Sequence, residues 1–428
     1  MRPFTACLTA TSLAALAVSA ATGTATADIA QPSVVSANPV NNTPHVLDGT
    51  VRAIAVVGNL VVVGGNFEEV REAGSGKKTL KRHNLFAYDM RNGKISTVFT
   101  PKVDGTVHAL QAGTSGWVYL AGTFKTVNGT KTGTVASLKT TTNKVHTGFK
   151  PAVNYRVTTM VRRGTRLYIG GTFTKAGGKA RTALARLNAL TGAADTGFDF
   201  KVSTPRSGDL KVYRLAVDPA DKRMVINGTF TQVDGKRRPQ IAMINLGSGT
   251  AKLSTWATEE YADACNLAAF DTYMRGMDFS PDGKYFVVVT TGGGYGRTAL
   301  CDSAARWEAS TTGTGQKPTW VNWTGGDTLL STSATGSAVY VGGHQRWLDN
   351  PRGRDSAGPG AVSRPGIGAL NPSTGKALAW NPTRTLGHGV EALVAHPKGL
   401  LVGSDTDQLG KEFHGRLGMF PAAEPGVR

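Results

Sequence analysis

Three short segments in the later half of the chain combine side chains that could bind or transform a sugar or an anion. Carboxylates and imidazoles can transfer protons, and a guanidinium can hold a planar oxyanion with two parallel hydrogen bonds. An indole ring beside such a cation can stack on a sugar or a base. The competing interpretation is that these side chains only hold structural units together. The candidate residues in these segments are Arg306, His344, Arg346, Trp347, Asp405 and Asp407.

A second set of polar residues occupies one equivalent position in a recurring short strand. That strand has an apolar residue, two variable residues and another apolar residue, as in Val51-Arg52-Ala53-Ile54. If the copies surround a common axis, their first variable residues meet there. They then form either a polar binding funnel or a network of structural ion pairs. The residues at this position are Arg52, His108, Tyr213, Arg275 and Glu391.

Signatures of familiar catalytic and cofactor sites are missing from the sequence. It contains no Walker loop, no Gly-x-Ser-x-Gly elbow and no His-Glu-x-x-His motif. Asp405 and Asp407 are too few carboxylates for a calcium loop. We therefore predict no cofactor and no metal site.

The elements that must position these residues form a repeat. An apolar strand, a Gly-Gly pair or a near-equivalent, and then a phenylalanine recur at intervals of 49 to 57 residues, and weaker copies follow near residues 286, 339 and 400. The strand with variable residues precedes each copy, and two further strands follow it. Four short strands per repeat are typical of one β-propeller blade. The phenylalanines of the strong copies are Phe67, Phe124, Phe173 and Phe230.

The two ends of the repeat array complement each other. The last copy stops after its third strand, near Phe420, and the segment from Val40 to Val46 looks like the missing fourth strand. We therefore predict an all-β chain with a single seven-bladed β-propeller over residues 38–421, its last blade closed by the N-terminal strand. Residues 28–37 and 422–428 are expected to be a disordered N-terminal tail and a C-terminal tail. A β-solenoid is the alternative, but solenoid repeats are usually shorter and end in caps.

The first 27 residues are typical of a signal peptide. They contain an early Arg2, an apolar run over 13–18 and the small residues Ala25-Thr26-Ala27 as a cleavage site. No later apolar stretch is long enough to cross a membrane. The sequence therefore predicts a secreted, extracellular protein without a membrane span.

Cys265 and Cys301 are the cysteines that remain after this leader. Two cysteines in an exported chain favour one disulfide bond, because export routes are oxidising. Both fall in connections on the same predicted face of their blade, so we predict that they are bonded. The alternative is two buried free thiols.

The repeat resembles a known family. Gly-Gly-Thr-Phe-Thr, with Val-x-Ala-Leu before it and Thr-Gly and Phe-x-Pro after it, is similar to the delta-60 repeat of bacterial exported β-propeller proteins. The likeness is good over residues 46–245. The segments 342–347, 364–367, 380–382 and 402–407 look like a subfamily in secreted proteins of Gram-positive mycelial bacteria. The resemblance implies an extracellular seven-bladed propeller and implies no reaction.

The chain is strongly basic, with 48 Lys and Arg against 29 Asp and Glu and a formal net charge of +19. Such an excess favours anionic partners, among them cell-wall polymers, acidic polysaccharides, lipid head groups and nucleic acid. Many of these cations fall in the loops after the Gly-Gly pairs, which share one predicted face. The alternative is that they only keep the protein soluble.

We therefore predict a secreted, monomeric, non-catalytic propeller that binds an anionic polymer or glycan at the cell surface. The alternative is an extracellular hydrolase or lyase that acts on polysaccharide, with its site on blades 5–7. Elaborated loops on one face are where repeat proteins usually bind. We expect the ligand-binding residues around the axis where blades 5, 6 and 7 meet, with three of them deeper in the funnel. The rim set is Arg275, Arg306, His344, Arg346, Trp347, Asp405 and Asp407, and the deeper set is Arg52, His108 and Glu391.

Overall fold

The computed structural model describes residues 29–423 except 248, 264, 267 and 294–298. Every regular element in these ranges is a β-strand. The predicted signal peptide and most of the predicted C-terminal tail lie outside the described residues. Within the described ranges there is no helix long and apolar enough to cross a membrane.

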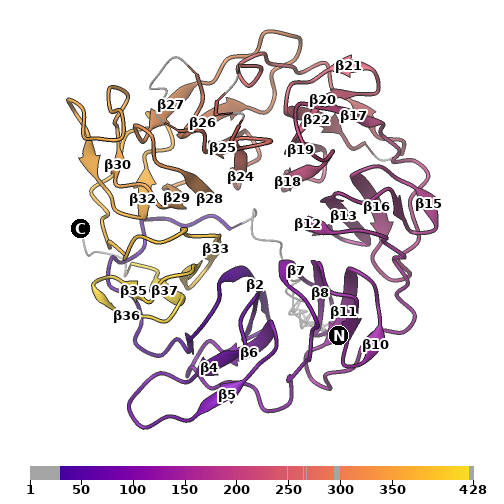
Figure 1. Ribbon diagram of the computed structural model, residues 1–428, viewed down its shortest axis with the longest axis vertical. Coiled ribbons are helices and arrows are strands. Elements are labelled where there is room, and N and C mark those ends of the chain that lie inside the picture. The colour runs from indigo at the N-terminus through magenta and orange to yellow at the C-terminus, as the bar shows by residue number, and fades with distance from the viewer. Residues whose placement is uncertain (1–28, 248, 264, 267, 294–298, 424–428) are drawn as a thin grey trace, which may run out of the picture.

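Antiparallel sheets stand side by side around a central axis (Figure 1). Each is named here by its innermost strand, and its strands run outward in chain order. The first sheets are β2 (Val51–Val57), β3 (Leu60–Gly65) and β6 (Leu85–Asp89); β7 (Val107–Ala112), β8 (Trp117–Gly122) and β11 (Val135–Lys139); β12 (Val157–Arg163), β13 (Arg166–Gly171) and β16 (Leu184–Asn188); and β18 (Val212–Val217), β19 (Arg223–Gly228), β22 (Ile241–Asn245) and β23 (Lys252–Leu253).

The remaining sheets continue in the same order around the axis. They are β24 (Met274–Phe279), β25 (Tyr285–Thr290), β26 (Ser303–Glu308) and β27 (Trp320–Trp323); β28 (Leu329–Ala334), β29 (Val339–Gly343) and β32 (Ile367–Leu370); and β33 (Ala392–His396), β34 (Gly399–Gly403) and β37 (Leu417–Pro421).

The hydrophobic core lies between neighbouring sheets. The alternating residues of each strand pack on both sides, so a separate apolar cluster fills each seam. One of these clusters contains Val61 and Val63 of β3 together with Leu401 and Met419 of the β33 sheet. The first and last sheets of the chain are therefore in contact. The repeated phenylalanines are at most 1% exposed, and each packs within such a cluster.

The fourth strand of most repeats is shorter than the sequence predicts. Four-stranded order occurs in the β18 and β24 sheets. In four others, the fourth segment makes a single bridge to the third strand, as between Tyr88 and Ile95. In three of these four repeats a proline follows the bridge, at Pro101, Pro151 and Pro382. Because proline cannot donate a ladder hydrogen bond, continued pairing is disfavoured there.

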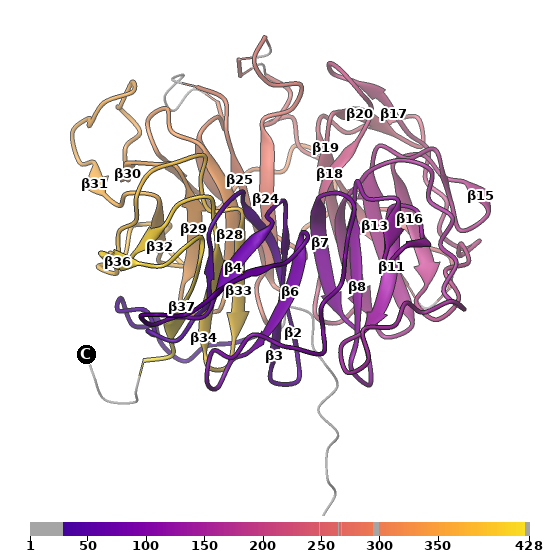
Figure 2. The ribbon, with the colours of Figure 1, turned by 60° about the horizontal axis from the view of Figure 1, so that its bottom comes forward.

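The connections after the Gly-Gly pairs, predicted as loops, fold as small hairpins on one face of the molecule (Figure 2). The short turns between β2 and β3 and between β33 and β34 lie on the other face. The hairpins are β4 (Glu69–Arg71) with β5 (Thr79–Lys81), β9 (Thr126–Val127) with β10 (Thr130–Lys131), β14 (Lys175–Ala176) with β15 (Lys179–Ala180), β20 (Phe230–Val233) with β21 (Lys236–Arg237) and β17 (Val202–Pro205), β30 (Trp347–Leu348) with β31 (Val362–Ser363), and β35 (Gln408–Leu409) with β36 (Glu412–Phe413).

The N-terminal segment runs beside the last strand of the chain. The Val40 amide donates to the Met419 carbonyl at 2.9 Å, as the Ser96 amide donates to Ala87 in the β2 sheet. The strand β1 (His45–Val46), however, pairs with β4 and not with β37. The residues near Val40 thus lie along the last sheet, and β1 contacts β4 as Val103 bridges Val127 in the next repeat.

The expected disordered tail is also corrected over its described part. The Gln31 side chain donates to the carbonyls of His396 and Gly399, at 3.0 and 2.9 Å. The Val35 amide donates to the Tyr340 hydroxyl, and the Val35 side chain is 3% exposed. This segment is held because it satisfies buried polar groups, which composition alone does not reveal.

A repeated arginine connects four of these hairpins to the fourth segments of their sheets. In every case Nη1 donates to the carbonyl of the preceding residue, and Nη2 donates to a carbonyl of the fourth segment. These guanidiniums are therefore structural, although the sequence suggested that they belong to a basic ligand-binding face. The arginines and their fourth-segment partners are Arg82 with Ser96, Arg181 with Asp195, Arg238 with Ser254, and Arg364 with Leu378.

The predicted bond between Cys265 and Cys301 is present, with the Cα atoms 5.9 Å apart. It takes the place of the repeated phenylalanine. Thr290 pairs with Met274 as Gly65 pairs with Val51, so Gly292 is equivalent to Phe67. A Cβ atom on Gly292 would lie 2.6 Å from the Cβ of Cys265. The disulfide thus fills the space that an aromatic ring fills in other sheets.

We predict that Arg238→Ala lowers the free energy of unfolding by about 1–3 kcal/mol, because two backbone carbonyls lose a charged donor. Arg238 is 8% exposed. The matched control is Arg237→Ala, which breaks an exposed ion pair with Glu259 and is expected to cost under about 1 kcal/mol. Denaturant unfolding measures both. Equal losses in the two variants would contradict the structural role.

We also predict that replacing Cys265 and Cys301 by alanine lowers stability by ~4 kcal/mol, as estimated from chain entropy for a separation of 36 residues. Thermal unfolding with and without dithiothreitol checks this. The reductant should lower the melting temperature of the wild type and leave that of the variant unchanged. A wild type that is insensitive to complete reduction would refute the stabilising role.

Candidate functional site

The N-terminal ends of several innermost strands enclose a cavity of about 210 Å³ near the axis. These ends lie on the hairpin face, because each innermost strand begins opposite the Gly-Gly pair that leads into a hairpin. We call this cavity the funnel. It is lined by Arg52, His108, Arg156, Thr158, Lys211, Tyr213, Arg214 and Glu391.

Two of the funnel cations have acidic partners. Arg52 Nη1 lies 2.9 Å from Glu391 Oε1, and Lys211 Nζ lies 2.5 Å from Asp271 Oδ2. Arg214 donates only to the carbonyls of Thr158 and Tyr213. Neither Arg156 nor Arg214 forms an ion pair with a carboxylate within the described part of the chain. The funnel therefore carries an excess of positive charge.

The surroundings tune the ionisable groups of the funnel. Burial, together with the charges of Arg52, Arg214 and Arg156, lowers the pKa of His108 to about 4, so this imidazole is neutral at pH 7. Burial opposes ionisation of Glu391, but the hydrogen bond from His388 and the charge of Arg52 outweigh it and lower its pKa to about 2. The funnel thus combines fixed cations, one neutral imidazole and one carboxylate.

Tyr213 organises the cations of one wall. Its ring lies 4.7 Å from the guanidinium carbon of Arg214 and 5.3 Å from that of Arg275. The ammonium of Lys211 lies 6.0 Å from the same ring. Cations held over an aromatic face keep their charge while losing conformational freedom. This wall is preorganised for a negatively charged group.

The predicted residues separate into two groups in space. Arg52, His108 and Glu391 line the funnel together, and Arg275 reaches its edge through Tyr213. His344 contacts the carbonyl of His388, whose ring lies 3.4 Å from Glu391. The funnel is therefore formed by the β33, β2, β7, β12 and β18 sheets. The expected place was the meeting point of blades 5, 6 and 7, which are the β24, β28 and β33 sheets.

Arg306, Asp405 and Asp407 lie outside the funnel lining. Arg306 bridges two sheets by donating to Glu308 and to the carbonyl of Pro372, at 2.8 Å each. Asp405 accepts the amides of His388 and Gly389 and so shapes the turn before β33. Asp407 is exposed just before β35. Their expected convergence with the axial residues is not observed.

Sequence reasoning missed four residues that line the funnel. Arg156 and Lys211 directly precede the first valine of β12 and β18, and Thr158 and Arg214 occupy the variable positions after it. Thr158 is in the same column of the repeat as Arg52, Arg156 and Lys211 are two columns before it, and Arg214 is one column after it. The signal was thus present in the repeat itself.

Comparison with known proteins supports the fold. A model of the DUF5122 β-propeller, a domain of unknown function, matches residues 166–198. The WD40 β-propeller domain of Doa1 superposes with a TM-score of 0.50 at 10% identity, covering 92% of this chain and 98% of that one. The chain has a β-propeller fold. The designed Ika8 protein is similar at a TM-score of 0.48 and 13% identity over 90% of this chain and 99% of that one. No curated protein matches.

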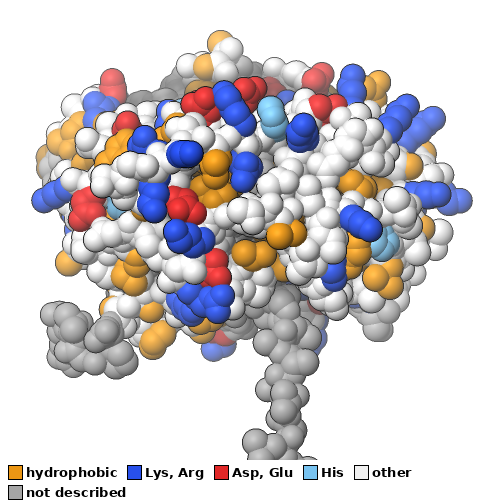
Figure 3. Space-filling view, turned by 90° about the horizontal axis from the view of Figure 1, so that it is seen from below, with side chains coloured by type: hydrophobic (Ala, Val, Ile, Leu, Met, Phe, Trp, Pro, Cys, Tyr) orange, Lys and Arg blue, Asp and Glu red, His pale blue; other side chains and the backbone are white. Residues whose placement is uncertain are grey.

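On the outer rim of the propeller, Lys and Arg side chains are spread among acidic ones (Figure 3). Lys175, Lys179 and Lys236 are exposed on the hairpins. Others are paired, as Lys81 is with Glu69 and Arg237 is with Glu259. The side of the outer rim seen in Figure 3 is therefore a mixed surface, whereas Arg52, Arg156 and Arg214 converge on the funnel.

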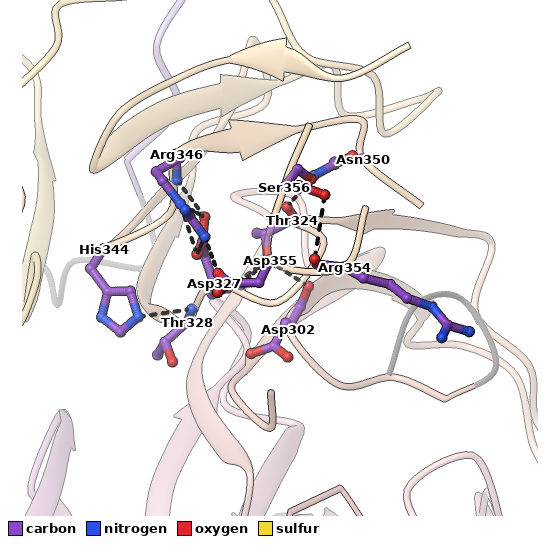
Figure 4. A network of polar contacts seen from close by, with 10 residues as sticks. All are labelled: Asp302, Thr324, Asp327, Thr328, His344, Arg346, Asn350, Arg354, Asp355 and Ser356. Carbon is purple, nitrogen blue, oxygen red and sulfur yellow. Dashed lines mark hydrogen bonds and ion pairs between the residues drawn. The ribbon is translucent and has the colours of Figure 1, made fainter. Parts of the chain in front are cut away.

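A second polar network lies between the β24 and β28 sheets (Figure 4). Arg346 donates to both oxygens of Asp327, at 2.7 and 3.0 Å, and also pairs with Asp355. Its guanidinium carbon lies 4.4 Å from the Trp347 ring. These contacts occupy the guanidinium, which favours the interpretation that Arg346 and Trp347 hold the β28 sheet in place.

Asp302 lies below this network and is 2% exposed (Figure 4). Neither carboxylate oxygen has a well-formed hydrogen bond to another described residue. Burial, reinforced by the nearby charge of Asp327, raises its pKa to about 7, although the Gly293 amide and Arg275 oppose the shift. Ionising this group therefore costs free energy in the folded protein.

We predict that the free energy of unfolding falls as pH rises from about 4 to about 7 through Asp302. Over that range the unfolded chain has lost this proton while the folded protein keeps it, so the free energy of unfolding decreases by about 1.4 kcal/mol for each unit that the pH rises. The free energy of unfolding of Asp302→Asn, minus that of the wild type, should therefore be larger at pH 8 than at pH 5. Denaturant unfolding at both pH values measures the difference.

The matched control is Asp282→Asn. Burial opposes ionisation of Asp282, but hydrogen bonds from Ser280 and Lys284 lower its pKa. It is ionised at both pH values, so its effect on stability should not change between them. If the effect of Asp302→Asn is equally constant, the assignment to Asp302 is wrong.

Proposed function

We propose that this propeller binds an anionic ligand in the funnel without transforming it. The observation that carries the proposal is the convergence of Arg156 and Arg214, which have no carboxylate partner among the described residues, on a cavity near the axis. Unpaired cations in a partly enclosed site attract anions strongly, because the low dielectric there weakens solvent screening. A guanidinium can also hold an oxyanion through two hydrogen bonds.

The proposal places the protein outside the cell, where it acts as a secreted monomer on an anionic polymer or glycan of the cell surface. The leader-like residues 1–27 support export. A disulfide that replaces a core aromatic ring is suited to an oxidising compartment. The small funnel favours one charged group of such a polymer over a long stretch of it.

We also propose that the scaffold is one closed ring of seven blades and that residues near Val40 complete the last blade. We propose further that the protein is of the delta-60 repeat type. The core cluster between the β33 and β2 sheets supports closure. So does the bond between Val40 and Met419, which repeats the contact of the fourth segment in other sheets. A closed ring would fix the distances across the funnel.

The second candidate is a hydrolase or lyase that acts on polysaccharide at the β24 and β28 sheets. The observation that favours it is Asp302, a buried carboxyl group whose pKa near 7 would suit a general acid. Product release from a panel of glycans would support this candidate, whereas salt-sensitive binding without turnover supports the first.

We predict that Arg156→Gln weakens binding of dextran sulfate about tenfold, equivalent to ~1.4 kcal/mol. Arg156 is exposed and makes no hydrogen bond to another described side chain, so its loss should leave folding intact. The control, Lys179→Gln, removes the same charge from the rim and should leave affinity within about twofold. Titration calorimetry at two salt concentrations, with uncharged dextran alongside, measures these affinities. Equal losses in both variants, or no binding of the polyanion, would overturn the proposal.

A further inference from the structure

The excess positive charge of the funnel is larger than one carboxylate can neutralise. Pairing of Arg52 with Glu391 and of Lys211 with Asp271 leaves Arg156 and Arg214 to be neutralised. A phosphate monoester carries about −1.5 to −2 charge at pH 7 and presents three strong acceptor oxygens. A carboxylate or a sulfate ester carries one charge and would leave one of these cations uncompensated.

The donors also approach from several sides. Arg52 and His108 come from the adjacent strands β2 and β7, while Arg156 precedes β12 and Arg214 lies in β18. A tetrahedral oxyanion directs its oxygens outward in different directions and can meet such donors simultaneously. A planar carboxylate presents both oxygens in one plane, which suits a single guanidinium better. The arrangement therefore favours phosphate.

Glu391 indicates what is attached to that phosphate. It is 9% exposed, stays ionised, and accepts hydrogen bonds from Arg52 and His388 on the wall of the same cavity. A carboxylate can accept further hydrogen bonds from hydroxyl groups, whereas it repels a second anion. A sugar or polyol next to the phosphate supplies such hydroxyls.

The size of the cavity limits the ligand to a small group. Its 210 Å³ corresponds to about seven water molecules at ~30 Å³ each, enough for a phosphate and one sugar or polyol unit. Building on the proposed function, we propose that the funnel binds the phosphate ester of a sugar or polyol, with phosphate on Arg156 and Arg214 and a hydroxyl on Glu391. The group can come from a free sugar phosphate or from a phosphorylated polymer.

The test is calorimetric titration of the purified protein with glucose 6-phosphate, inorganic phosphate, glucose 6-sulfate, glucuronate and glucose. Glucose 6-phosphate should bind at least tenfold more tightly than glucose 6-sulfate and glucuronate, and glucose should not bind. Glu391→Gln should reduce the advantage of glucose 6-phosphate over inorganic phosphate by severalfold. Arg156→Gln should weaken both phosphates together. Thermal melting of each variant verifies that it is folded.

Comparable binding of glucuronate, or an unchanged ratio of the two phosphates in Glu391→Gln, would overturn the inference. If dextran sulfate still binds in a manner that depends on Arg156, the proposed function stands while the ligand class is wrong. If no anion binds in that manner, both fail. Capture on phosphomannan beads that glucose 6-phosphate displaces identifies a polymer as the source, and binding of the free ester alone identifies a soluble compound.

Discussion

No single sheet of this chain can bury its own apolar residues, and the rest of the structure depends on that constraint. Each small sheet has two apolar faces, so it is stable only between two others. The β2 and β33 sheets, which lie at opposite ends of the chain, therefore share a core cluster that contains Val61 and Leu401. Radial packing of this kind directs the inner ends of all the innermost strands toward the axis. Polar residues at these inner ends are therefore brought together because apolar residues are buried between the sheets.

The abundant arginines serve two distinct purposes in this arrangement. Arg82 and Arg238 donate to backbone carbonyls that hairpins and fourth segments would otherwise leave without a donor. These cations strengthen the outer part of each sheet and have little capacity left for a ligand. Arg156 and Arg214 instead face the funnel without a described acidic partner. A net charge alone cannot distinguish these cases, because it does not say which carbonyls and carboxylates lie nearby.

Much of the β-structure followed from the sequence, because alternating apolar residues and glycine pairs are local signals. The disulfide and the grouping of Arg52, His108 and Glu391 also followed, since repeats place equivalent residues equivalently. The hairpins, the contacts of Gln31 and the structural arginines did not. They depend on hydrogen bonds to backbone carbonyls distant in sequence, such as that from Gln31 to Gly399. The identity of the donor residue does not reveal which carbonyl will accept its hydrogen bond.

The sheets whose innermost strands are β24, β28 and β33 depart most from the repeat consensus, and these departures have structural causes. Gly292 departs because a disulfide occupies the space of the usual phenylalanine. Thr406, which is at the equivalent position near β34, accepts a hydrogen bond from the buried Arg384. At these two positions the substitution is matched by a compensating group, because a void or an unsatisfied polar group in a buried core costs free energy. In the funnel, by contrast, Arg156 and Arg214 have no carboxylate partner among the described residues. In a repeat protein, an uncompensated polar residue is therefore a better guide to a ligand site than an unusual one.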